Sequence, residues 1–257
     1  MIPLSDDNPT LRTPIVTYLL LGAIGATWFF VQGAGLNSLA LIRSVCELGL
    51  VPGELTRLAP VGLGVPIGGG LSCVVDNAPI NRLTPLTSMC LHGSWSHLLG
   101  NCLFFWVFGN NVEDSMGRLR FLVFYVVCGL AAAAAQVLVD PASPIPMVGA
   151  SGAISGIMGA YLILYPRVRV NMLFIFIIIF RIIPLPAWLV LLYWFGLQVL
   201  TGLPQLNQVD AEGGSGVAVW AHVGGFVAGL VLVKFFENRD LTSRRTGWRH
   251  RMHPNHP

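Results

Sequence analysis

Long apolar runs constrain the fold of this 257-residue chain more than any other feature of its sequence. A bilayer core of about 30 Å requires about 20 mostly apolar residues in one helix. Runs that approach or reach this length lie at about 15–31, 85–108, 119–139, 149–165, 186–200 and 217–236. Because 54% of the residues are apolar and only 11% are charged, a soluble fold could not cover its surface with polar groups. We therefore predict an all-α membrane protein with six transmembrane helices.

Two shorter stretches need a separate interpretation. The run at about 149–165 is rich in Gly, Ala and Ser, which predicts a helix surrounded by other helices rather than by lipid. A seventh run, 172–180, has about half the length that a span requires, and Arg181 and Pro184 close it. We expect this seventh run to be a connector that lies at the membrane interface or packs against the bundle.

The positive charges predict how the chain is oriented. An even number of spans places both termini on one side, and cytoplasmic loops carry an excess of Lys and Arg. Of the 15 Lys and Arg residues, all but Arg43, Arg57 and Arg82 fall on the side of the termini. This distribution predicts three parts: a cytoplasmic N-terminus (1–14), a membrane domain (15–236, with an extracytoplasmic loop at 32–84) and a basic cytoplasmic tail (237–257). The compact length and the absence of an organellar presequence favour a bacterial plasma membrane.

The predicted outer loop has features of its own. Its first part, 36–50, has apolar residues at helical spacing, with Arg43 and Glu47 four residues apart. The five cysteines cannot all pair, because their number is odd. Cys46 and Cys73 both lie in this loop, so they are the pair that a disulfide would join if the compartment is oxidising.

Polar side chains are costly in hydrocarbon, so those within the spans are the first functional candidates. The second span carries His92, His97 and Asn101 in HGSWSHLLGN; the fourth carries Ser151 in GASGAISG; the sixth carries His222 in WAHVGGFVAG. Under the charge assignment, all of them lie in the outer half of their spans. Three helices therefore offer polar groups at a similar depth.

The residue types narrow the chemistry. Helical rotation of about 100° per residue separates His92 and His97 by about 140°, and no HExxH sequence is present, so a metal site is not expected. The spans contain no pair of carboxylates for aspartyl chemistry. Among hydrolytic mechanisms this leaves a serine hydroxyl activated by a histidine base, for which Ser151 and His222 are the candidates.

Glycines next to these candidates allow the required proximity. Gly149 and Gly152 flank Ser151, and Gly225 follows His222, so that two helices could approach closely enough for a direct hydrogen bond. Each feature alone also has a structural interpretation, because small residues in membrane helices usually serve packing, and a lone histidine can be a hydrogen-bond donor or a proton relay. Ser155 is expected to be structural, with its hydroxyl bonded to a carbonyl one turn back.

The three motifs, in this order, resemble the rhomboid family of intramembrane serine proteases over residues 82–230. The resemblance implies that Ser151 is the nucleophile and His222 its base, without a third acidic residue. It also implies an oxyanion hole formed by His97, Asn101 and the backbone N–H of Ser151, and a structural role for His92. Residues 111–114 (NVED) are similar to the turn that follows the second span in this family.

The sequence departs from the family pattern at two places. Many members have a Trp-Arg pair shortly before the second span, where this chain has Arg82, Leu83 and Thr84. Some bacterial members have a Tyr four residues after the nucleophile, stacked on the histidine, where this chain has Ser155. What orients His222 is therefore open.

The resemblance implies a six-transmembrane-helix rhomboid-type bundle with a long first outer loop. The implied function is an intramembrane serine endopeptidase that cleaves membrane-anchored proteins within or near their transmembrane segment. Its expected partners are a transmembrane protein substrate and the lipid bilayer; no nucleic acid, metal or other cofactor is expected. The alternative is a non-catalytic scaffold, chaperone or transporter that uses the polar helix cluster for binding, although the paired repeats typical of a transporter are not found in the sequence.

Overall fold

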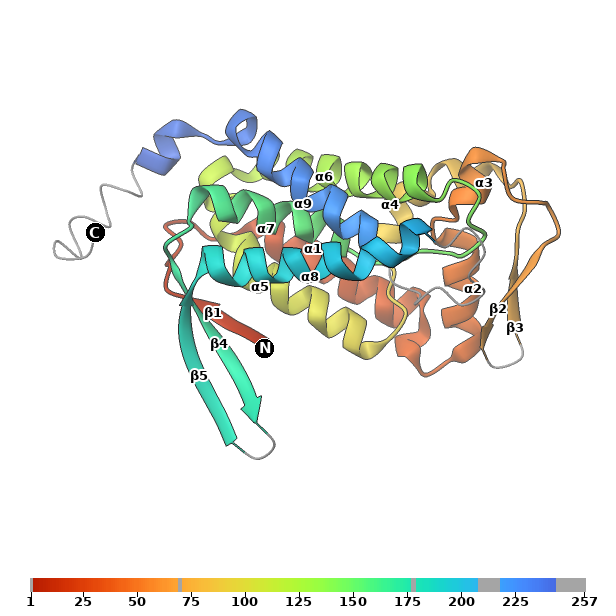
Figure 1. The fold of residues 1–257 in the computed structure, drawn as a ribbon, viewed down its shortest axis with the longest axis horizontal. Coiled ribbons are helices and arrows are strands. Elements are labelled where there is room, and N and C mark those ends of the chain that lie inside the picture. Colours follow the sequence, from red (N-terminus) through yellow and green to blue (C-terminus); the bar gives the residue numbers. More distant parts are fainter. Residues whose placement is uncertain (1, 69–70, 177–178, 208–217, 244–257) are drawn as a thin grey trace.

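The computed structural model describes the chain except for residues 1, 69–70, 177–178, 208–217 and 244–257. Helices form a bundle, and a small antiparallel sheet lies at each of its two ends (Figure 1). The bundle helices are α1 (Ile15–Ala26), α5 (Trp95–Met116), α6 (Arg118–Val139), α7 (Ser151–Leu164), α8 (Ala187–Asn207) and α9 (Val219–Phe236). Of the described helices, α6, α8 and α9 are long and apolar enough to cross a membrane. Two shorter apolar helices are α7 and α1, the latter continued by the π-helical turn η1 (Thr27–Val31).

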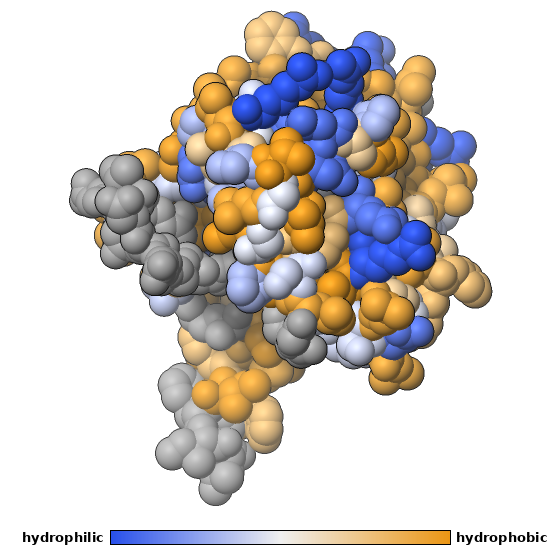
Figure 2. Space-filling view, turned by 90° about the vertical axis from the view of Figure 1, so that its right-hand side faces the viewer, coloured by the Kyte–Doolittle hydropathy of each residue, from blue (hydrophilic) through white to orange (hydrophobic). Residues whose placement is uncertain are grey.

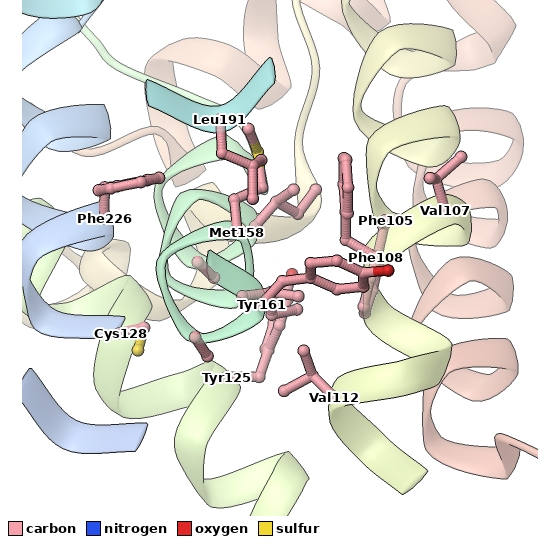
Figure 3. Close-up of a cluster of buried hydrophobic side chains, with 14 of the residues drawn as sticks. Phe105, Val107, Phe108, Val112, Tyr125, Cys128, Met158, Tyr161, Leu191 and Phe226 are labelled. Atoms are coloured by element: carbon pink, nitrogen blue, oxygen red, sulfur yellow. The ribbon is translucent and has the colours of Figure 1, made fainter. Parts of the chain in front are cut away.

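Helix α7 lies at the centre of the bundle, as its Gly, Ala and Ser content predicts. Its residues from Gly152 to Tyr161 are buried. Figure 3 shows that side chains from the surrounding helices meet around it, including Phe108 from α5, Tyr125 from α6, Leu191 from α8 and Phe226 from α9. The walls of this core therefore hold α7 in place from several directions.

The closest helix contact joins α7 to α9. A Cβ atom at Gly225 would overlap the carbonyl oxygen of Gly152, and a Cβ atom at Gly229 would overlap that of Gly156. The two helices thus touch main chain to main chain, which only glycine permits. The close approach predicted from these glycines is confirmed.

Helix α5 begins and ends later in the sequence than the predicted span at 85–108. Two short turns, α4 (Thr84–Thr87) and η4 (Ser88–Cys90), precede it, and the long helix begins only at Trp95. The reason is an N-cap, because the Ser94 side chain accepts a hydrogen bond from the backbone N–H of His97 at 3.2 Å.

The same helix continues past the predicted end because its charged residues have partners. The Glu113 carboxylate accepts hydrogen bonds from Val16 N, Thr17 N and Thr17 Oγ1, and so caps the start of α1. Asp114 forms an ion pair with Arg12 at 3.1 Å. The NVED segment is therefore the last part of α5 rather than a turn after it.

Strands lie near the C-terminal end of α5 and also at the opposite end of the bundle. The all-α prediction is therefore correct for the bundle but wrong for its ends. The described part of the expected connector at 172–180 belongs to the paired strands β4 (Arg169–Phe176) and β5 (Ile179–Pro186), which project sideways from the bundle (Figure 1). Residues 177–178 of that connector lie outside the described residues. The N-terminal strand β1 (Ile2–Asp6) pairs with β4 and gives the order β1-β4-β5. The many Ile, Val and Phe residues of β4 and β5 favour strand over helix.

The opposite end, here called the α2 end, is formed by the connection between α1 and α5. It contains α2 (Ser38–Leu48), α3 (Pro52–Thr56), the hairpin of β2 (Gly64–Gly68) and β3 (Leu71–Val74), and the 3₁₀ turns η2 (Gly33–Gly35) and η3 (Pro79–Arg82). The predicted helix with its Arg43–Glu47 pair is present, at 2.7 Å. A disulfide joins Cys46 of α2 to Cys73 of β3. Figure 2 looks onto this end, where hydrophilic patches alternate with apolar ones.

Both ends of the described chain lie opposite the α2 end. Leu11 N donates to the Asp114 carboxylate, and Asn238 N donates to the carbonyl of Ser115, so the segments before α1 and after α9 both contact the C-terminal end of α5. Of the predicted tail at 237–257, the part from 244 onward lies outside the described residues.

Candidate active site

A cavity of about 460 Å³ lies at the start of α7. Its lining comes from the five bundle helices α5 to α9 and from the segments before α5 and α7. It includes the residues singled out from the sequence: His97, Asn101, Gly149, Ser151, Gly152 and His222. These candidates thus lie around one cavity, although more than 120 positions separate the first from the last in the sequence.

Ser151 and His222 are in direct contact. Ser151 is the first residue of α7, and its Oγ lies 2.8 Å from Nε2 of His222 on α9. The hydroxyl of Ser155 donates to the carbonyl oxygen of Ser151 at 2.6 Å, as predicted for a structural serine. Of the two serines of this motif, Ser151 is therefore the one whose hydroxyl faces the histidine.

Gly149 places His97 beside this pair. It has a φ of 130°, which disfavours any residue with a side chain. A Cβ atom at this position would lie 2.7 Å from His97 Nε2 and 3.4 Å from Ser151 Oγ. Both atoms therefore border the space that glycine leaves free.

His97 and Asn101 present donors to the cavity. Nδ1 of His97 accepts a hydrogen bond from Gly93 N at 3.4 Å, so the proton of a neutral ring is carried by Nε2. Asn101 is 7% exposed, and no described residue is a hydrogen-bond partner of its Nδ2. Buried donors usually have a partner, so this amide is suited to a group that enters the cavity.

His92 lies behind these residues rather than at the cavity. It is fully buried, and its backbone N–H and carbonyl both bond to the side chain of Gln32, at 2.9 and 2.8 Å. Its ring contacts that of His97, with centroids 5.0 Å apart. The predicted angular separation of the two histidines was wrong, because His92 precedes the helix and helical rotation does not apply to it.

Two residues on α8 also contact the site, and sequence reasoning missed them. Oε1 of Gln198 lies 2.9 Å from Nδ1 of His222, and the ring of Trp194 lies 5.9 Å from the imidazole. The available signal was a polar residue within an apolar run, the same signal that identified His222.

Comparison with known proteins gives the family of this chain. The sequence model of the Rhomboid domain matches residues 81–239, more than half of the chain. The chain belongs to the rhomboid family. As such, and with its long apolar helices, it is an integral membrane protein.

Individual rhomboid relatives match over shorter stretches. The Rhomboid protease GluP of Bacillus subtilis (strain 168) is 42% identical over 77 residues, which are 30% of this chain and 15% of that protein. The Rhomboid protease AarA of Providencia stuartii is 34% identical over 97 residues, which are 33% of this chain and 34% of that protein. RHOMBOID-like protein 5 of Arabidopsis thaliana is 34% identical over 77 residues, which are 30% of this chain and 25% of that protein. The matched stretches thus span about a third or less of these relatives, and two of the three are named as proteases.

Proposed function

We propose that this rhomboid is a serine endopeptidase that uses Ser151 and His222 to cleave membrane-anchored proteins within or near their transmembrane segment. The observation that carries the proposal is the 2.8 Å contact between Ser151 Oγ and His222 Nε2 at the wall of a cavity. A serine hydroxyl is a weak nucleophile until a neighbouring base accepts its proton, and this contact provides such a base.

The proposed reaction has two steps. His222 Nε2 accepts the Ser151 proton while Oγ attacks the carbonyl carbon of the scissile peptide bond. The tetrahedral intermediate then expels the amine, which takes the proton from His222, and leaves an acyl ester on Ser151. In the second step a water molecule gives a proton to His222 and attacks the ester carbonyl. The second intermediate then releases the carboxylic acid, while His222 returns its proton to Oγ and so restores the Ser151 hydroxyl.

The negative charge of the intermediate needs donors. His97 Nε2, Asn101 Nδ2 and the backbone N–H of Ser151 are proposed to supply them. Helix N-termini carry N–H groups without partners in their own helix, and Ser151 occupies this position in α7. The buried Asn101 amide, for which no described residue is a partner, supports this assignment.

The membrane topology is part of the proposal. We assign six spans: α5, α6, α8 and α9, and the shorter helices α1 with η1 and α7. The membrane domain then covers 15–236, with 1–14 and 237–257 in the cytoplasm and the loop 32–84 outside. The Cys46–Cys73 disulfide at the α2 end supports an oxidising compartment on that side. The excess of Arg at the other end supports the same orientation. A bacterial plasma membrane remains the expected location.

The proposal is tested by labelling the purified protein in lipid with a fluorophosphonate probe, which reacts with activated serines. We expect label on Ser151 in the wild type and none in Ser151→Ala or His222→Ala. Ser44→Ala is the control, because Ser44 bonds a carbonyl of its own helix at the α2 end. It should be labelled like the wild type.

A generic transmembrane substrate gives the second measurement. We expect cleavage by the wild type and by Ser44→Ala only. If a correctly folded wild type neither reacts with the probe nor cleaves the substrate, the catalytic assignment is wrong, and a scaffold, chaperone or transporter takes its place.

A further inference from the structure

The second nitrogen of the His222 ring has a partner on α8. Nε2 faces Ser151 Oγ at 2.8 Å, and Nδ1 faces Oε1 of Gln198 at 2.9 Å. Both ring nitrogens are therefore engaged, each by a different helix. The ring cannot rotate about its Cβ–Cγ bond without losing both contacts.

The partner atom decides which nitrogen carries the proton. An amide oxygen accepts hydrogen bonds and never donates one, so Nδ1 must be the donor in this contact. In the neutral ring, Nε2 then has a free lone pair that points at Ser151. This is the tautomer that a base requires, since the other tautomer would present an N–H to the serine.

A second contact from the same helix fixes the plane of the ring. Trp194 precedes Gln198 by four residues, so the two side chains lie on one face of α8. The Trp194 ring lies 5.9 Å from the imidazole at an interplanar angle of 41°. The position four residues after Ser151, where some family members have a ring that stacks on the histidine, is held by Ser155, whose hydroxyl bonds the Ser151 carbonyl instead.

We propose that Gln198 is a positioning residue that holds His222 in its base-competent tautomer, with Trp194 packed beside the ring. This inference rests on the proposed function. A neutral amide suits the location, because a carboxylate in the same place would be costly within the membrane. Gln198 therefore supplies the orienting hydrogen bond of a catalytic triad without its negative charge.

The first experiment compares Gln198→Leu with Gln198→Glu, in lipid, by cleavage of a transmembrane substrate and by the rate of fluorophosphonate labelling. Gln198→Leu removes the acceptor, and we expect kcat to fall about tenfold to a hundredfold with little change in KM, as for other partners that orient a functional histidine. Gln198→Glu keeps an acceptor oxygen and should retain activity. Its carboxylate favours the protonated ring, so the acid limb of its pH–rate profile should move to higher pH.

The matched control is Thr201→Val. Thr201 is an exposed polar residue of the same helix, and its hydroxyl bonds the carbonyl oxygens of Leu197 and Gln198 within α8. Its removal should leave both the rate and the pH profile unchanged. Unfolding curves in detergent show whether each variant is folded.

The tautomer is also measured directly, without any variant at Gln198. NMR of the wild type with labelled histidine, assigned by the loss of one signal in His222→Ala, should show Nδ1 protonated and Nε2 unprotonated. A ring protonated at Nε2 overturns the proposal. Wild-type kinetics and pH profile in Gln198→Leu overturn it as well, although Ser151 would still be labelled and the proposed function would stand. If the wild type itself is inert, the proposed function fails first, and this inference falls with it.

Discussion

His222 belongs to α9 and is contacted by side chains of α8, but the bundle holds these two helices in different ways. α9 touches the central helix α7 main chain to main chain, across Gly225 and Gly229. α8 is joined to α9 by side chains, namely by Phe195 stacked on Phe226 with ring centroids 4.6 Å apart and by the contacts of Gln198 and Trp194 with His222. The distance between the α7 and α9 backbones is thus fixed by glycine, whereas the orientation of the ring depends on side chains of a more peripheral helix.

The largest expected effect is at the main-chain contact. Gly229→Ala places a Cβ atom on the carbonyl oxygen of Gly156, so α7 and α9 must move apart. We expect the free energy of unfolding to fall by about 3 kcal/mol, the upper part of the range for overpacked sites. Unfolding by denaturing detergent in mixed micelles measures this change.

The matched control is Gly196→Ala on α8. A Cβ atom there has no described neighbour within 4 Å. The variant should be neutral or gain up to about 1 kcal/mol, since alanine is the better helix former. Equal losses at Gly229 and Gly196 would contradict the distinction between the two helices.

A smaller effect on stability is expected at Glu113, whose side chain caps the start of α1 away from the cavity. Glu113→Ala leaves the N–H groups of Val16 and Thr17 at the start of α1 without their acceptor. We expect a loss of about 2 kcal/mol in the free energy of unfolding, the usual cost of unsatisfied buried donors. Cleavage per folded molecule should not change, because α1 does not line the cavity.

Glu113→Gln keeps one acceptor oxygen and should recover part of this loss. Thermal unfolding and substrate cleavage, measured on the same preparations, separate the two quantities. A lower cleavage rate in fully folded Glu113→Ala would show that the support of α1 reaches the active site.

The smallest effect is expected at Trp194. Trp194→Leu removes the ring beside His222, and we expect kcat to fall about tenfold, which corresponds to about 1.4 kcal/mol and to the upper value of an aromatic contact. Trp194→Phe should recover most of the rate. If Leu and Phe are equivalent, bulk rather than the aromatic contact matters at this position.

The sequence predicted the residues that meet at the cavity better than it predicted the elements that carry them. Ser151, His222, His97 and Asn101 were found because polar groups are rare and costly in apolar runs, and that rule does not depend on helix boundaries. The start of α5 was misplaced because apolar length was counted without the Ser94 cap. That cap was readable as a serine three residues before His97.

Other features depended on contacts that no local pattern contains. The α5 helix accommodates two acidic residues because α1 donates hydrogen bonds to Glu113 and Arg12 forms an ion pair with Asp114. Both partners lie about 100 positions away in the sequence. The length of the 172–180 run predicts a connector, whereas its β-branched and aromatic residues favour strands. Gln198 reaches His222 only because α8 packs on α9. This packing brings its amide to Nδ1, the ring nitrogen that faces away from Ser151.

The N-terminal strand has a consequence for biosynthesis. Ile2 pairs with Leu173, and the hydroxyl of Tyr161 donates a hydrogen bond to Asp6, so the partners of β1 belong to a much later part of the chain. At about 5–20 residues per second, a ribosome needs roughly 10 to 30 s to travel from one to the other. During that time β1 has no strand to pair with. Closure of the β1-β4-β5 sheet is therefore a late event of assembly, and protection of β1 from proteases would report that β4 has paired with it.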